Sequence, residues 1–216
     1  GLPDSIWNGR LSDLREEILH YRGIDPKKTP ITVEPGIHYF MGGILVDRFH
    51  RTNLAGLYAA GECTSQYHGA NRLGGNSMLG ALYGGQVAAK TAASKALPEG
   101  KCTPVTEEDA LTEPVSPSFA RELGEILSEG LSIVRREESM ESALKKLGSL
   151  TPENEREENR RYLAQAMLRA ALSRRESRGA HYREDFPEAR EEERVPTIAV
   201  FEGGSSQRIL REEIGR

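Results

Sequence analysis

Apolar residues recur at helical spacing through the second half of the chain. They form three stripes, which predict three helices that bury their apolar sides together as an antiparallel three-helix bundle. Thr151 and Pro152 fit the cap and first position of the third helix, which we expect to run to about Ser177. The stripe residues are Phe119, Leu123, Ile126, Leu127, Leu131 and Val134; Met140, Leu144 and Leu147; and Tyr162, Leu163, Ala166, Met167, Ala170 and Ala171.

The first half and the C-terminal end show shorter patterns. An amphipathic stripe predicts a helix over residues 11–22, which ends at Gly23. Alternation around residues 44–46 and an apolar run over residues 54–60 predict two strands on either side of a turn. Near the end, the runs Thr197–Phe201 and Gln207–Leu210 flank Gly-Gly-Ser-Ser, which predicts a terminal β-hairpin.

Residues 77–96 predict a helix rich in small side chains. Gly80, Gly84 and Ala88 lie four residues apart. Glycine costs a helix about 1 kcal/mol relative to alanine, so this spacing indicates that another group approaches the helix backbone closely. A packed neighbouring strand and a bound cofactor both remain open as that group.

Composition divides the chain near residue 110. Charged side chains number 23 in residues 1–110 and 39 in residues 111–216, whereas 11 of the 22 glycines fall between Gly36 and Gly85. The stretch between the two regimes carries several prolines and few apolar residues. Composition therefore indicates a glycine-rich, tightly turned part followed by a charged helical part.

Charge and cysteine content exclude several classes of protein. The formal net charge of −4 argues against a general nucleic-acid binder, which needs basic excess. No apolar run is long enough for a transmembrane segment, and no signal-peptide pattern opens the chain. Two cysteines cannot form a disulfide framework or a four-ligand zinc site, so we expect a reducing compartment and no metal site.

Two glycine-rich segments carry the candidate chemistry. Residues 56–62 read as a buried strand that ends in a glycine turn and Glu62, a carboxylate suited to accept hydrogen bonds from sugar hydroxyls. Residues 68–77 form a glycine-rich loop that enters the small-residue helix. Such a helix start presents free backbone N–H groups at a positive dipole end, which binds anions or stabilises developing negative charge.

Three strings of the chain closely resemble the flavoprotein subunit of the succinate dehydrogenase and fumarate reductase family. They are Ile37-His-Tyr-Phe-Met-Gly-Gly-Ile44, Gly56-Leu-Tyr-Ala-Ala-Gly-Glu62 and His68-Gly-Ala-Asn-Arg-Leu-Gly-Gly-Asn-Ser77. The segment 175–187 is similar to that family's C-terminal helical domain. L-aspartate oxidase, a sister flavoenzyme, carries similar blocks, but its loop more usually reads Met-Ala-Ser where this chain has Leu73-Gly74-Gly75, which favours the succinate and fumarate side.

The resemblance implies an α/β plus all-α fold class and divides the chain into five segments. These are a tail of the capping domain (1–30), the C-terminal part of an FAD-binding α/β domain (31–97), a linker (98–117), a helical domain (118–193) and a C-terminal hairpin (194–216). The Gly-x-Gly-x-x-Gly strand, turn and helix that hold the FAD pyrophosphate do not occur in residues 1–216. We therefore expect a C-terminal fragment that is inactive by itself, with no catalytic residue of its own and with FAD bound only in the full-length protein.

The resemblance also assigns roles to individual residues. His38 and Arg72 would bind a small dicarboxylate substrate, and the planar guanidinium of Arg72 suits a carboxylate. Glu62 would bind the FAD ribityl hydroxyls, His68 and Gly69 would lie beside the flavin ring, and backbone N–H groups would face the flavin N1/O2 edge. Those N–H groups belong to Ser77, Met78 and Leu79.

The implied reaction interconverts succinate and fumarate by hydride transfer at flavin N5 and passes electrons to an iron–sulfur partner. The implied location is cytoplasmic, peripheral at the inner face of a membrane through that partner. Two alternatives stay open: an L-aspartate oxidase-like flavoenzyme, and a helical docking module in which residues 118–193 bind an electron-transfer partner or assemble an oligomer.

Each assigned residue also has a purely structural interpretation. His38 could be a structural histidine, Arg72 could pair with a nearby acid, and Glu62 could cap a helix. The charged side chains Arg175, Glu176, Arg178 and His181 are typical of an ion-paired structural knot rather than of catalysts. Neither His20 nor His50 is given a role.

Overall fold

The computed structural model describes residues 2–33, 35–65, 67–95, 113–201 and 207–211. The chain divides into two compact units, Gly1–Tyr39 and Phe40–Arg216. In the part that the structure describes, no helix is both long and apolar enough to cross a membrane.

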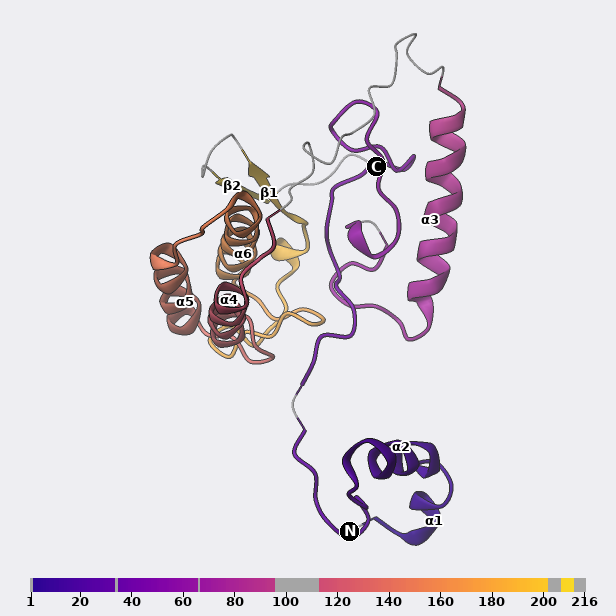
Figure 1. The fold of residues 1–216 in the computed structure, drawn as a ribbon. Helices are drawn as coiled ribbons and strands as arrows, with labels where there is room; N and C mark the ends of the chain where they lie inside the picture. The colour runs from indigo at the N-terminus through magenta and orange to yellow at the C-terminus, as the bar shows by residue number, and fades with distance from the viewer. Residues whose placement is uncertain (1, 34, 66, 96–112, 202–206, 212–216) are drawn as a thin grey trace. The chain divides into compact units, whose positions relative to one another are not determined.

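The first unit consists mainly of two helices. They are α1 (Asp4–Trp7) and α2 (Ser12–Arg22), the latter within one residue of its predicted bounds (Figure 1). Gly23 ends α2 in the left-handed conformation, with φ of 66°, as a glycine cap requires. Behind it, the Arg15 guanidinium binds Asp25 at 2.8 Å and ties the helix to the following turn.

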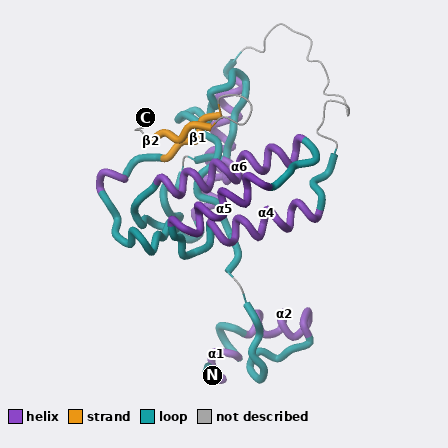
Figure 2. The backbone as a smooth tube through the Cα atoms, turned by 90° about the vertical axis from the view of Figure 1, so that its left-hand side faces the viewer, coloured by secondary structure: helices purple, strands orange, loops and turns teal. Residues whose placement is uncertain are grey.

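Three helices of the second unit share a hydrophobic core. They are α4 (Pro117–Gly130), α5 (Glu137–Ser149) and α6 (Glu155–Ser173), and each contacts the other two (Figures 1 and 2). Leu163, which the stripe had placed inside, is 57% exposed, and Leu168 is fully buried instead. The buried core residues are Phe119, Leu123, Ile126, Met140, Ala143, Leu147, Leu150, Ala164, Leu168 and Ala171.

The start of α6 differs from the prediction. Asn154, not Thr151, is the cap, because its side-chain oxygen accepts the Glu157 N–H at 3.0 Å. The buried Glu157 carboxylate accepts the N–H groups of Glu153 and Ser116 at 2.9 and 2.8 Å. These backbone hydrogen bonds lower the pKa of Glu157 although burial opposes them. A buried carboxylate thus fastens the start of α6 to the start of α4.

The end of the chain adds a pair of strands. β1 (Thr197–Phe201) pairs with β2 (Gln207–Arg211) in antiparallel register, with Thr197 opposite Arg211. Both strands contact α6, and Figure 2 shows the pair beside that helix. The predicted Gly-Gly-Ser-Ser turn lies outside the described residues.

The predicted strands around residues 44–46 and 54–60 are wrong as regular strands. This stretch makes only isolated bridges, a parallel one between Ile44 and Thr64 and an antiparallel one between Arg51 and Tyr58. A strand needs a continuous ladder of backbone partners, and no other strand among the described residues supplies one here. The segment instead winds through turns and a short 3-10 helix, η1 (Gly61–Cys63), which packs on α3.

Candidate functional site

The N-terminus of α3 (Asn76–Ala93) is open and uncapped. Gly75 precedes the helix in the left-handed conformation with φ of 82°, and no side chain caps the first turn. The first turn also lacks an acidic residue. The amides of Ser77 and Met78 belong to the first turn, whose N–H groups have no partner within the helix. Leu79 lies one position farther on, where helix geometry directs its N–H to the Gly75 carbonyl.

Glu62 lies on η1, which packs beside α3. Its carboxylate is exposed and accepts the N–H of Phe40 at 2.9 Å. The alternative role of Glu62 as a cap of α3 does not hold, because that helix has no side-chain cap. A Cβ at Gly61 would lie 3.6 Å from the Ala81 side chain, so the turn sits close against the helix.

A buried histidine and a tyrosine hold this turn on α3. The His50 ring is 1% exposed, and its Nδ1 lies 2.8 Å from the Ala59 carbonyl oxygen. The Tyr67 hydroxyl lies 3.3 Å from the His50 ring nitrogens and accepts the Gly61 N–H at 3.4 Å. A Cβ at Gly84 would overlap that hydroxyl at 1.6 Å. The close approach predicted for this helix is real, and its partner is a tyrosine ring rather than a strand.

Sequence reasoning gave His50 no role and did not single out Tyr67. The one local signal is conformational, since His50 adopts φ of 62°, which is rare for a residue with a side chain. Such a conformation is not visible in the sequence. Together the two rings connect the Glu62 turn to α3 at Gly84.

The loop before α3 contains the other predicted site residues. His68 and Arg72 are half-buried, and Gly69 adopts φ of 59°. The His68 ring packs against Tyr67 with a centroid distance of 5.8 Å. The Arg72 N–H donates to the Asn71 side-chain oxygen at 2.9 Å, which fixes the local backbone.

The structure brings most predicted site residues into one region, but not all. Glu62, the loop 68–72 and the start of α3 all belong to the second unit. His38 is exposed and belongs to the first unit. Its role therefore stays a prediction from the resemblance.

The predicted ion-paired cluster is present, but partly with other residues than predicted. Glu176 is fully buried and binds Arg178 at 2.9 Å and Arg174 at 2.5 Å. Burial raises the pKa of Glu176, but hydrogen bonds from Arg178, the Arg190 amide and Arg174 outweigh it and lower the pKa to about 2. Arg175, expected in the knot, instead pairs with the half-buried Glu137 at 3.6 Å.

A second buried charge joins this knot. The Arg183 guanidinium is fully buried and binds both oxygens of Asp185 at 2.6 and 2.7 Å. It also donates to three carbonyls where α6 ends, which is at Ser173 rather than the predicted Ser177. His181 faces Arg135 at 2.7 Å; burial and that positive charge lower its pKa to about 4. We call the turn 176–185 with these ion pairs the C-terminal knot.

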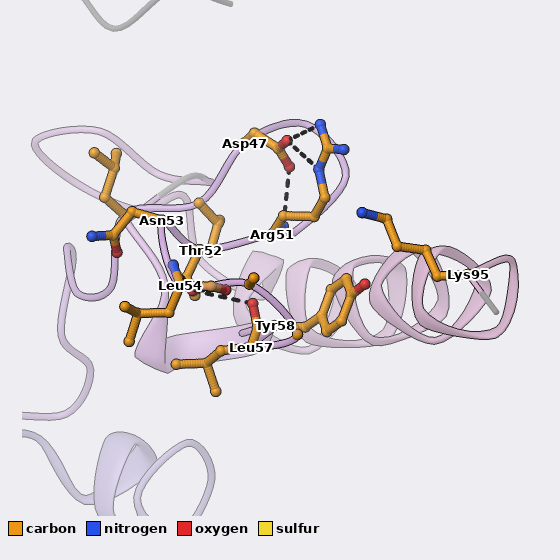
Figure 3. A pocket seen from close by; sticks show the side chains of 12 residues that line it. Asp47, Arg51, Thr52, Asn53, Leu54, Leu57, Tyr58 and Lys95 are labelled. Atoms are coloured by element: carbon orange, nitrogen blue, oxygen red, sulfur yellow. Dashed lines mark hydrogen bonds and ion pairs between the residues drawn. The ribbon is translucent and has the colours of Figure 1, made fainter. Parts of the chain in front are cut away.

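A separate pocket lies at the other end of α3. Its lining includes the Asp47–Arg51 ion pair, at 2.6 Å, and Lys95 (Figure 3). None of the predicted site residues lines it. Among the described residues, no cluster of three or more histidine, cysteine or acidic side chains could hold a metal ion.

Comparisons with known proteins match both parts of the chain. Residues 1–78 match the family described as an FAD binding domain, and residues 156–211 match the fumarate reductase flavoprotein C-terminal family. L-aspartate oxidase of Pyrococcus furiosus is 42% identical over 83% of this chain and 37% of that protein. One of the subunits of the fumarate reductase (CoM/CoB) of Methanothermobacter marburgensis is 37% identical over 88% of this chain and 40% of that protein.

The fold has a solved counterpart. Sdh1 of Mycobacterium smegmatis superposes with a TM-score of 0.81 and 29% identity, covering 100% of this chain and 42% of that one. The chain thus spans about two fifths of the length of these relatives. The FAD-binding match covers the part of the chain with the glycine-rich motifs, and the C-terminal match covers α6 of the helical core and the residues after it. The chain belongs to the FAD-dependent flavoprotein family of succinate dehydrogenase, fumarate reductase and L-aspartate oxidase.

Proposed function

We propose that this chain forms the substrate-facing, C-terminal part of a flavoenzyme that oxidises or reduces a C4 dicarboxylate, and that it is inactive without the dinucleotide-binding segment. The observation that supports this most is the loop 68–75. It places a half-buried arginine directly before an uncapped helix start. One element therefore offers a cation for a substrate carboxylate and amides for a cofactor.

The donor set of α3 fits a flavin. Uncapped amides and no acidic residue in the first turn make a positive helix end, which favours negative charge at the flavin N1/O2 edge. A Cβ at Gly74 or Gly75 would meet nothing within 4 Å, so the loop is open on that side. When bound, FAD supplies reversible two-electron chemistry at N5. Ser77 and Met78 would hold its pyrimidine edge by their amides, with Leu79 behind them.

The other cofactor contacts would come from the turn and the loop. Glu62 is exposed and ready to accept hydrogen bonds from ribityl hydroxyls. His68 and Gly69 would lie beside the ring. The His50 and Tyr67 rings hold the Glu62 turn against α3.

Arg72 would bind and orient the substrate. A guanidinium makes two parallel hydrogen bonds to a carboxylate, which fixes both the position and the direction of the dicarboxylate. His38 would bind the same substrate as a hydrogen-bond donor. With its carboxylate held by Arg72, the substrate would keep its reacting C–H bond at one place over the flavin.

Two observations favour different dicarboxylates. Leu73-Gly74-Gly75 in the loop favours the succinate and fumarate pair. The 42% identity with an L-aspartate oxidase favours L-aspartate as the second candidate. We place succinate and fumarate first because the loop borders the substrate position directly, whereas identity averages over the whole alignment.

Anaerobic flavin reduction separates these candidates. The full-length protein is mixed with succinate or L-aspartate, and flavin absorbance is followed; the reduced protein is then mixed with fumarate. We expect bleaching by succinate and recovery with fumarate. Bleaching by L-aspartate alone establishes the second candidate, and no response to any of the three refutes dicarboxylate chemistry.

The charged surface of the helical part supports a partner role. We propose that an iron–sulfur electron-transfer subunit docks on the full-length protein and holds it in the cytoplasm at the inner face of a membrane. The alternative, a docking module without chemistry, predicts a purified full-length protein that carries no flavin absorbance.

A further inference from the structure

The C-terminal knot touches the loop that carries Arg72. The Ala180 N–H donates to the Ala70 carbonyl oxygen at 2.9 Å. Gly179, beside it, faces the same carbonyl so closely that a Cβ there would lie 2.2 Å from the Ala70 oxygen and 2.5 Å from its carbon. Two segments far apart in sequence thus meet backbone to backbone, two residues before Arg72.

Further hydrogen bonds brace the turn that makes this contact. Arg178 and His181 exchange two backbone hydrogen bonds, at 2.8 and 3.1 Å, around Gly179, whose φ is +59°. The Ser177 hydroxyl donates to the Phe186 carbonyl at 2.9 Å and accepts the Arg183 N–H at 2.8 Å.

Buried charges fasten the turn to α6. Arg178 binds the fully buried Glu176 through two nitrogens. Arg183 binds the carbonyls at the end of the helix. The turn therefore moves with the helical core, because shifting it would break buried ion pairs.

The part of the Arg72 loop that meets this turn lies at the surface. It is glycine-rich, and Ala70 and Asn71 are exposed. The Ala180–Ala70 hydrogen bond therefore ties a surface segment of this loop to the knot.

We propose that the Gly179–Ala180 turn positions Arg72, so that the helical part of the chain sets the geometry of dicarboxylate binding. This rests on the proposed role of Arg72 in substrate binding. Gly179 is a positioning residue in this scheme and does not touch the substrate. Only glycine fits, because a side chain at 179 displaces the Ala70 carbonyl and the arginine that follows it.

The test uses Gly179→Ala in the full-length protein. Calorimetry measures the dissociation constant of malonate, a dicarboxylate that has no adjacent pair of methylene carbons to oxidise. We expect this constant and the substrate KM to rise together, lowering kcat/KM on the order of 10- to 100-fold, as misplacement by about 1 Å can do. Flavin content should be unchanged.

Gly23→Ala is the matched control. Gly23 has φ of +66° but nothing within 4 Å of its Cβ position, so it carries the same backbone strain without the collision. It should leave the malonate constant unchanged. A wild-type protein that does not bind malonate refutes dicarboxylate binding itself, whereas wild-type affinity in Gly179→Ala overturns only the positioning role.

A second variant decides the matter if Gly179→Ala loses flavin or does not fold. Ser177→Ala loosens the turn without a collision. It should raise the malonate constant by a smaller factor, about threefold, which is the low end of what losing a hydrogen bond costs, because the Ala180–Ala70 hydrogen bond itself stays. Ser139→Ala, which removes an exposed hydroxyl bonded to the Arg136 carbonyl, is its control. Equal malonate affinity in both serine variants overturns the proposal.

Discussion

Replacing Arg183 by methionine should destabilise the helical part of the chain strongly. The guanidinium is fully buried and holds the Asp185 carboxylate with two bonds of 2.6 and 2.7 Å. It also donates to the carbonyls of Ala171, Leu172 and Arg174 at 3.1 to 3.3 Å. Methionine fills similar volume but leaves these acceptors without their donor.

The size of the effect follows from what is left behind. Removing one partner of a buried ion pair costs about 3–5 kcal/mol. The lower end applies, because the Asp185 side chain is 28% exposed and keeps the Glu137 N–H at 2.9 Å. We therefore expect a loss of about 3 kcal/mol in the free energy of unfolding, or roughly 6–12 °C in Tm for a unit of about 150–250 residues.

The assay is urea and thermal unfolding of the 216-residue chain, followed by helical circular dichroism. Arg136→Met is the control, because the Arg136–Glu184 pair lies in the same knot with side chains 62% and 48% exposed. An exposed pair contributes about 0–1 kcal/mol. Equal losses for Arg183→Met and Arg136→Met would refute the assignment of stability to the buried charge.

Three further outcomes are expected. Gly84→Ala should lower the free energy of unfolding by about 1–3 kcal/mol, because its Cβ collides with the Tyr67 hydroxyl. Gly85→Ala has open space around its Cβ and should raise it by up to about 1 kcal/mol. Equal effects of the two variants in urea unfolding would contradict the packing of Tyr67 on α3. The free energy of unfolding should fall as the pH falls. Because burial lowers the pKa of His181 to about 4, the unfolded chain binds a proton there more readily, and stability is lost from pH 6.5 towards 4. The stability that Glu176 and Asp185 contribute through their lowered pKa values is lost below about pH 4.5 towards 2. A urea midpoint that stays constant from pH 7 to 3 contradicts this. Finally, the 216-residue chain should bind FAD weakly or not at all, since it lacks the pyrophosphate segment, and submicromolar affinity by calorimetry contradicts that.

The spacing of apolar residues predicted the helices well, because a helix is specified by residues only three or four positions apart. The stop at Gly23 and the helical spacing of α2 needed no distant partner. The start of α6 was misplaced because Thr151-Pro152 imitates a cap, while the true cap at Asn154 depends on Glu157, whose carboxylate binds the distant Ser116 amide. Such a contact between distant residues does not show in the spacing of apolar residues.

The strands and the support of the site depend on residues that are distant in sequence. A strand around 54–60 requires neighbours that pair with it along its length, and the pattern of apolar residues does not show whether they are there. The loop of Arg72 was found from its glycines and its helix. Its contact with Gly179 joins two backbones, so neither side chain reveals it.

The kinetics of Arg72→Ala test the central claim most directly. The measurement is kcat/KM of the full-length variant with the dicarboxylate that the wild-type protein uses, at equal flavin content. Truncating one member of a buried charge pair costs about 2–5 kcal/mol, so kcat/KM should fall by about 30-fold to several thousand-fold. Flavin should stay bound, because Glu62 and the amides of α3 are untouched. A variant with bound flavin and near wild-type kcat/KM would show that Arg72 is structural and that the dicarboxylate site lies elsewhere.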